Sequence, residues 1–102
     1  MNDKALGLLG LMRRANAVQI GEVNTGKAVR AGKAKLVVLA DDASANARKR
    51  AEGFVYGRGV PIMTIPYLKE QISAAVGVPG CSMLAVTDSG FANALIKSVS
   101  GL

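Results

Sequence analysis

The chain has no histidine and no tryptophan, and it carries one cysteine, Cys81, among its 102 residues. The missing histidine removes the commonest general acid–base side chain at neutral pH and nearly all catalytic zinc sites. A lone cysteine excludes an internal disulfide and a multi-cysteine zinc site, and it is typical of a reducing, cytoplasmic compartment. We therefore expect no histidine-dependent catalysis, no metal and no cofactor.

Acidic and aromatic side chains are also scarce. The chain has seven Asp and Glu residues and thirteen Lys and Arg residues, which gives a formal net charge of +6 and an isoelectric point near 9.9. This imbalance favours a polyanionic partner, nucleic acid before membrane. Of the four aromatic residues, Phe54 and Phe91 fit core stripes, which argues against a platform for stacking single strands. Recognition of a folded RNA by shape and backbone stays open.

Long apolar runs are absent as well. The first apolar stretch, Ala5 to Met12, is interrupted by glycines and is followed by Arg13 and Arg14. It is neither a signal peptide nor a membrane span, so we expect no membrane partner. The one close acidic pair, Asp41 and Asp42, is interpreted as a helix cap with a solvated neighbour, the alternative being a metal site that lacks further ligands.

Helix and strand signals alternate along the chain. In order, they predict a helix carrying Ala5, Leu8, Leu9 and Met12, a strand Val18–Ile20, a helix from Glu22 to Gly32, a strand Leu36–Ala40, a helix from a cap at Asp42 or Ser44 to about Tyr56, a strand Val60–Ile65, a helix lined by Leu68, Ile72 and Ala75 and ending at Gly77, a strand around Met83–Val86, and a last helix capped by Asp88 or Ser89. The order αβαβαβαβα indicates one α/β domain over residues 1–102. Its central sheet is expected to be parallel or mixed, with helices on both faces.

The segment Gly21 to Ala28 allows two incompatible interpretations. It is one residue short of the phosphate-binding loop G-x-x-x-x-G-K-[ST], but Ala28 stands where that loop needs a hydroxyl for magnesium, and Glu22 would face the phosphates. The other interpretation is a helix start that offers free amides and a lysine to an anion. We favour the helix start over a small nucleotide-binding enzyme.

Helical spacing divides this second helix into two sides. Thr25, Ala28 and Val29 share the side suited to packing on a sheet, whereas the opposite side carries Val23, Asn24, Lys27, Arg30 and Ala31. Lys33 continues the cations beyond the helix. An ordinary solvated helix face would carry the same kinds of side chain. The residues alone are therefore compatible with a binding site and with a surface that binds nothing.

A family resemblance separates these alternatives. The run Gly21 to Lys27, followed by Ala31 to Ser44, resembles the kink-turn-binding ribosomal-protein superfamily, whose large-subunit members are called seven-Ae and thirty-e. The segment Ala85 to Ala92 is similar to its bacterial branch, the YlxQ-type proteins. The resemblance implies a three-layer α/β/α sandwich around a four-stranded mixed sheet, as in thirty-e. It also implies a non-enzymatic protein that binds a sharply bent RNA containing tandem sheared G·A pairs.

The resemblance also implies roles for individual residues. Gly21 would allow close backbone approach, Asn24 would contact a G·A base edge, and Lys27 would contact the same region or a phosphate. Glu22 and Val23 would lie beside the RNA, and Thr25 would support the turn. Arg30 and Lys33 complete the expected RNA-binding set on this side. The loop after the third strand, with Ile65 and Pro66, would cover an extruded nucleotide, with Ile65 as the apolar contact.

The expected partner is therefore a structured, kink-turn-like RNA, for example ribosomal RNA or an mRNA leader, with the ribosome as a further partner of a monomeric protein. Val23 cannot hydrogen-bond a base, which keeps open an alternative from another class: a protein-interaction module of a ribosomal or RNA-processing complex.

Overall fold

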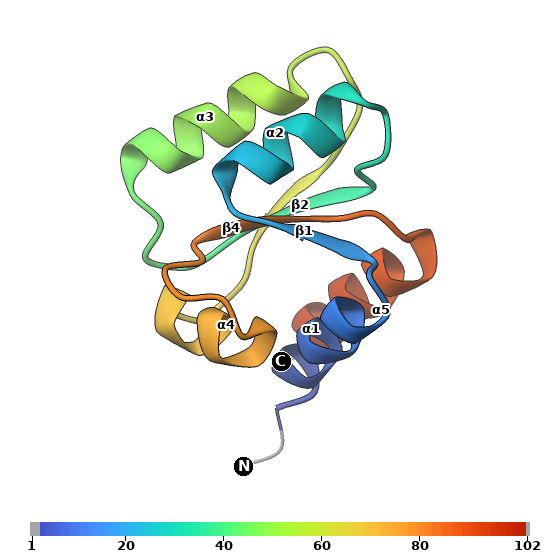
Figure 1. The fold of residues 1–102 in the computed structure, drawn as a ribbon, viewed down its shortest axis with the longest axis vertical. Helices are drawn as coiled ribbons and strands as arrows, with labels where there is room; N and C mark the ends of the chain where they lie inside the picture. The colour runs from blue at the N-terminus through green and yellow to red at the C-terminus, as the bar shows by residue number, and fades with distance from the viewer. Residues whose placement is uncertain (1–2, 102) are drawn as a thin grey trace.

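A computed structural model describes residues 3–101 and places five helices around a four-stranded sheet (Figure 1). The elements, in chain order, are α1 (Lys4–Arg14), β1 (Val18–Ile20), α2 (Glu22–Arg30), β2 (Leu36–Leu39), α3 (Ala45–Val55), β3 (Ile62–Thr64), α4 (Lys69–Val76), β4 (Met83–Val86) and α5 (Ser89–Ser100). The predicted order αβαβαβαβα is confirmed.

The sheet is mixed, with the strand order β1-β4-β2-β3. β4 pairs antiparallel with both β1 and β2, while β3 pairs parallel with β2. β3 is shorter than the predicted Val60–Ile65. Backbone bonds from Val37 N–H to the Pro61 oxygen and from Ile65 N–H to the Leu39 oxygen nevertheless continue the pairing at both of its ends.

Alternation along the two central strands divides the core into two layers. Leu36 and Val38 of β2 face α1, α4 and α5, whereas Val37 and Leu39 face α2 and α3. Side chains on a strand point alternately to opposite faces, so a strand buried on both faces must be apolar throughout. The predicted three-layer α/β/α sandwich is confirmed, with α2 and α3 above the sheet in Figure 1 and the other helices below it.

Caps and turns fix the helix ends. Ser44 caps α3 by accepting a 3.1 Å hydrogen bond from Ala47 N–H, and Asp88 caps α5 by accepting from Phe91 N–H at 2.9 Å. Asp42 does not cap α3. Its carboxylate instead accepts a 2.8 Å hydrogen bond from Lys69 N–H at the start of α4. Leu68 was predicted to line α4, but it precedes that helix and is 48% exposed.

Neither a membrane-spanning helix nor a cluster of metal ligands is found in residues 3–101. Within residues 3–101, no helix combines the length and the apolar character needed to cross a membrane. The same part of the chain contains no group of three or more His, Cys, Asp or Glu side chains placed to hold a metal ion. The Asp41–Asp42 pair therefore finds no further ligands there.

Candidate functional site

Gly21 forms the junction between β1 and α2. Its backbone has φ +95° and ψ 164°, a conformation that side-chain-bearing residues rarely adopt. A Cβ built on Gly21 meets nothing within 4 Å, so the constraint is the backbone conformation rather than space. Gly21 N–H donates to the Met83 oxygen at 2.9 Å, and this bond fixes the start of α2 beside the start of β4.

The two sides of α2 lie as the helical spacing predicts. Thr25, Ala28 and Val29 are buried, whereas Val23 is 69% exposed and Asn24, Lys27 and Arg30 are also exposed. Thr25 does not support the turn with its side chain. Its hydroxyl is fully buried without a hydrogen-bond partner, and only its backbone N–H reaches back to the Gly21 oxygen. Thr25 is a core residue and is removed from the set of surface residues.

The helix also excludes a phosphate-binding loop. Thr25 to Lys27 lie inside the helical hydrogen-bonding pattern of α2, which begins with the bond from Thr25 N–H to the Gly21 oxygen, so this part of the motif forms no open loop. Gly26 serves a packing role, since a Cβ at this position would lie 2.9 Å from Cε1 of Phe54. Because Gly26 has no side chain, the ring of Phe54 on α3 can approach the backbone of α2. The geometry of this motif therefore differs from that of a phosphate-binding loop.

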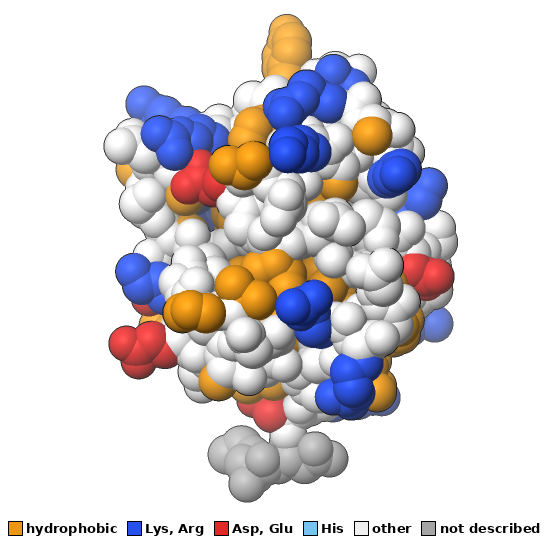
Figure 2. Space-filling model, in the orientation of Figure 1, with side chains coloured by type: hydrophobic (Ala, Val, Ile, Leu, Met, Phe, Trp, Pro, Cys, Tyr) orange, Lys and Arg blue, Asp and Glu red, His pale blue; other side chains and the backbone are white. Residues whose placement is uncertain are grey.

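Two adjoining concavities flank Asn24. One, of about 230 Å³, is lined by Gln19, Asn24, Lys27, Ala28, Ala31 and Lys33. The other, of about 200 Å³, is lined by Arg13, Asn16, Val18, Gln19, Ile20, Asn24 and Val78. We call the two together the α2 groove. Figure 2 shows hydrophobic side chains across the middle of this face, below the Lys and Arg side chains that gather over α2 and α3.

Asn24 and Gln19 are shared by both halves of the α2 groove. The Asn24 side-chain Nδ2 donates a 3.0 Å hydrogen bond to the Ile20 oxygen, which holds the amide against the end of β1. Its Oδ1 and its second N–H are left for an external partner. An amide held in this way can pair with the edge of a base. Lys27 and Lys33 place two cations in the same half of the groove.

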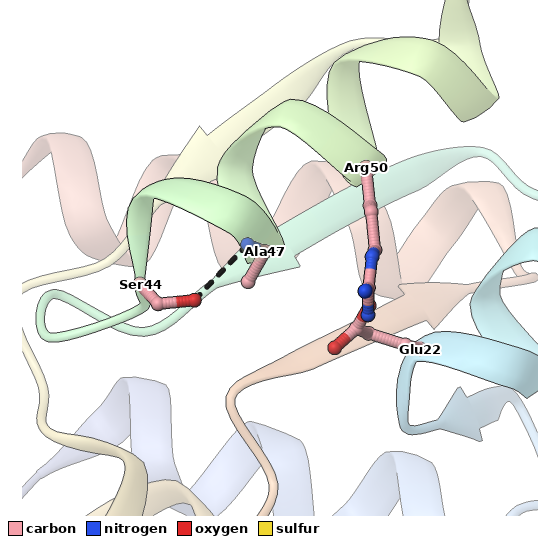
Figure 3. A network of polar contacts seen from close by, with 4 residues as sticks. All are labelled: Glu22, Ser44, Ala47 and Arg50. Carbon is pink, nitrogen blue, oxygen red and sulfur yellow. Dashed lines mark hydrogen bonds and ion pairs between the residues drawn. The ribbon is translucent and has the colours of Figure 1, made fainter.

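Glu22 does not present an isolated negative charge to this site. Its Oε1 lies 2.8 Å from Nη1 of Arg50 on α3, and the two side chains are 33% and 64% exposed, respectively (Figure 3). The hydrogen bond to Glu22 raises the pKa of Arg50 above its usual value, so the guanidinium stays charged. The pair leaves the start of α2 close to neutral at this point, although an acid stands in the motif.

The loop after β3 does not offer Ile65 to a ligand. Ile65 is completely buried in the core below the sheet, so its prediction as an apolar contact is wrong. Pro66 is exposed, and it does not line either half of the α2 groove. The apolar side chains that line the groove with Asn24 are Val18, Ile20 and Val78, the last from the segment between α4 and β4.

The sequence analysis missed Val78 and Gln19. Their position follows from the pairing of β1 with β4, because the bond from Gly21 N–H to Met83 brings the chain before β4 next to the start of α2. The alternation along β1 carries a partial signal for Gln19, which is the polar residue between Val18 and Ile20.

The structure thus sorts the predicted residues into groups. Asn24, Lys27 and Lys33 meet in the α2 groove. Val23 lies exposed on the outer side of α2, while Glu22 and Arg30 extend toward α3, since Arg30 Nη1 is 3.1 Å from a Cβ built on Gly26.

Comparison with known proteins was made against families, curated sequences and solved structures. Residues 3–96 match the model of the Ribosomal protein L7Ae/L30e/S12e/Gadd45 family. The chain is 38% identical over 90 residues to the RNA-binding protein YlxQ of Bacillus subtilis, covering 88% of this chain and 89% of that protein. It is 32% identical over 99 residues to the RNA-binding protein YlxQ of Enterococcus faecium, covering 97% and 94%.

Two solved structures share the fold. One, from Bacillus halodurans, is described as a protein with unknown function and superposes with a TM-score of 0.88 at 28% identity, covering 97% of this chain and 99% of that one. The other, the Giardia lamblia 15.5kD RNA binding protein, gives a TM-score of 0.72 at 22% identity, covering 99% and 89%. At 22% identity, the second likeness concerns the fold alone.

Proposed function

Because this chain belongs to the Ribosomal protein L7Ae/L30e/S12e/Gadd45 family, we propose that it is a non-enzymatic RNA-binding protein that recognises kink-turn or kink-turn-like RNA through the α2 groove. The observation that carries the proposal is the composition of this groove. Two side-chain amides, Gln19 and Asn24, lie there beside the cations Lys27 and Lys33 and the apolar Val78. The YlxQ relatives, both described as RNA-binding proteins, support RNA as the ligand.

Each part of the groove has a chemical task in this proposal. Lys27 and Lys33 neutralise phosphates, which supplies affinity and positions the protein. Asn24 and Gln19 pair with base edges, the contacts that distinguish sheared G·A pairs from ordinary ones. Val18, Ile20 and Val78 form an apolar floor on which an unstacked base can lie.

The mechanism is a shift of the RNA equilibrium. A protein that binds only the bent form moves the RNA toward that form, by no more than its difference in affinity for the two states. The same proposal includes a ribosomal RNA or an mRNA leader as the ligand and the ribosome as a further partner. It also includes a monomeric protein in the cytoplasm.

A second candidate function rests on Val23. Its side chain is 69% exposed on the outer side of α2 and cannot hydrogen-bond a base. An exposed apolar residue beside the groove suits contact with a protein in a ribosomal or RNA-processing complex. A protein partner that remains bound after nuclease treatment, and that is lost in Val23→Ser, would favour this candidate.

The first test is the salt dependence of binding. Lys27→Ala is expected to weaken binding to kink-turn RNA and to reduce the slope of log K against log salt by about 1, because one phosphate contact is lost. Lys97→Ala on α5, in the opposite layer, is the matched control and should leave both quantities unchanged. Equal effects of the two substitutions would mean that the positive charge acts without a defined site.

The Glu22–Arg50 ion pair gives a second test. In Arg50→Ala the carboxylate of Glu22 loses its partner and stands beside the RNA phosphates, so affinity should fall several-fold with little change in stability. Adding Glu22→Gln to Arg50→Ala should restore the affinity, since the uncompensated charge is then gone. A double variant that stays as weak as Arg50→Ala would mean that Arg50 itself binds the RNA.

A further inference from the structure

The turn that follows α3 holds the most exposed large hydrophobic side chain of residues 3–101. Tyr56 is 87% exposed, and no hydrogen bond of its hydroxyl is found in this part of the chain. Burial therefore does not explain an aromatic ring here. The sequence pattern placed Phe54 and Phe91 in core stripes and assigned no role to Tyr56.

The turn defines the backbone position from which this ring projects. Arg58 N–H donates to the Val55 oxygen at 2.9 Å, Tyr56 has φ −55° and ψ 124°, and Gly57 has φ +70°. These values match a type II turn with Tyr56 at its second position. A Cβ built on Gly57 or Gly59 would meet nothing within 4 Å, so the space around the turn is open.

Packing between α2 and α3 brings this turn to the end of α2. Glu22 pairs with Arg50, and one helical turn further along both helices Gly26 contacts Phe54. The two helices therefore run parallel, and their last residues, Arg30 and Val55, lie at the same end of the α2–α3 layer. Figure 1 shows α2 and α3 side by side, with their carboxyl ends at the same end of the molecule.

The charges at this end suit an anion. Arg30 and Arg58 form no ion pair with any residue from 3 to 101, and Lys33 follows the end of α2. Glu52, one helical turn before Tyr56, is the acid on this side of α3. Arg30, Lys33 and Arg58 outnumber it, so the charge at this end of the two helices is positive and suits a phosphate.

We propose that Tyr56, with Arg58 and Arg30, forms a second RNA contact, in which an unpaired nucleotide next to the kink-turn stacks its base on Tyr56 and its phosphate meets the two arginines. This inference rests on the proposed function. Stacking on an aromatic ring tolerates any base, and a tyrosine side chain has only two χ angles to immobilise on binding. Asn24 and Arg30 are about 9 Å apart along the α2 axis, so one RNA reaches from the α2 groove to this turn.

The test compares a kink-turn RNA with blunt ends and the same RNA carrying a short unpaired extension, made separately at its 5′ and 3′ ends and containing 2-aminopurine. For the wild-type protein, one extension is expected to tighten binding about tenfold and to quench the 2-aminopurine fluorescence. Tyr56→Ala should abolish both effects and bind blunt RNA normally. Tyr56→Phe, which keeps the ring, should behave as the wild type.

The outcomes separate this inference from the proposed function. If the wild-type protein binds the blunt kink-turn but neither extension adds affinity, or if Tyr56→Ala keeps the added affinity, the second contact is wrong and the α2 groove is unaffected. If no kink-turn RNA binds better than a straight duplex, the proposed function fails, and this inference fails with it.

Discussion

Replacing Asn24 with alanine should weaken binding to kink-turn RNA by on the order of 1–3 kcal/mol, the usual loss when a paired base contact is removed. The side-chain amide is held by its 3.0 Å bond to the Ile20 oxygen at the junction of both halves of the α2 groove, so its free atoms are already oriented for a base edge. Stability should change little, because Asn24 is exposed.

The control for this variant is Asn93→Ala, which removes an exposed amide from α5 in the opposite layer. Calorimetric titration at one salt concentration should give wild-type affinity for Asn93→Ala and a loss of about 5- to 150-fold for Asn24→Ala. Wild-type affinity in both variants would remove Asn24 from the site.

Ile65→Ala should act on stability instead of binding. Ile65 is completely buried among the residues of α1, α4 and α5, and removal of a buried isoleucine side chain costs about 2–5 kcal/mol of unfolding free energy. Urea unfolding measures this loss directly. The neighbouring Pro66→Ala, at an exposed position, is the matched control and should unfold close to the wild type.

Affinity measured for the folded fraction distinguishes the two possible roles of Ile65. We expect that fraction of Ile65→Ala to bind RNA as the wild type does. A variant of normal stability with weakened RNA binding would instead place Ile65 at the interface, contrary to its burial.

Patterns of apolar residues were sufficient to predict the order of helices and strands. Leu36–Leu39 and Met83–Val86 are fully buried strands because each presents apolar side chains to both faces of the sheet. The glycines that end α2 and α4 take up positive φ, as their places after apolar periodic segments indicate. Helical spacing likewise separated the exposed Asn24 and Lys27 from the buried Ala28 and Val29.

Patterns of apolar residues could not predict the parts of the site that depend on the order of strands in the sheet. Val78 reaches Asn24 only because β4 lies next to β1, and a sequence pattern does not specify which strands are neighbours. Ile65 was misplaced for a related reason: whether a residue at the end of a strand is covered depends on the helices packed below it. The burial of Thr25 was indicated by helical spacing, but the resemblance to a family assigned it a role in the turn.

The proposed function is tested most directly by one titration at fixed salt. It compares a standard kink-turn RNA with the same RNA in which Watson–Crick pairs replace the sheared G·A pairs. Recognition through the α2 groove predicts tight binding to the first RNA and much weaker binding to the second, with the preference reduced in Asn24→Ala. Equal and strongly salt-dependent binding to both RNAs would contradict it, because the +6 net charge alone would then account for the affinity.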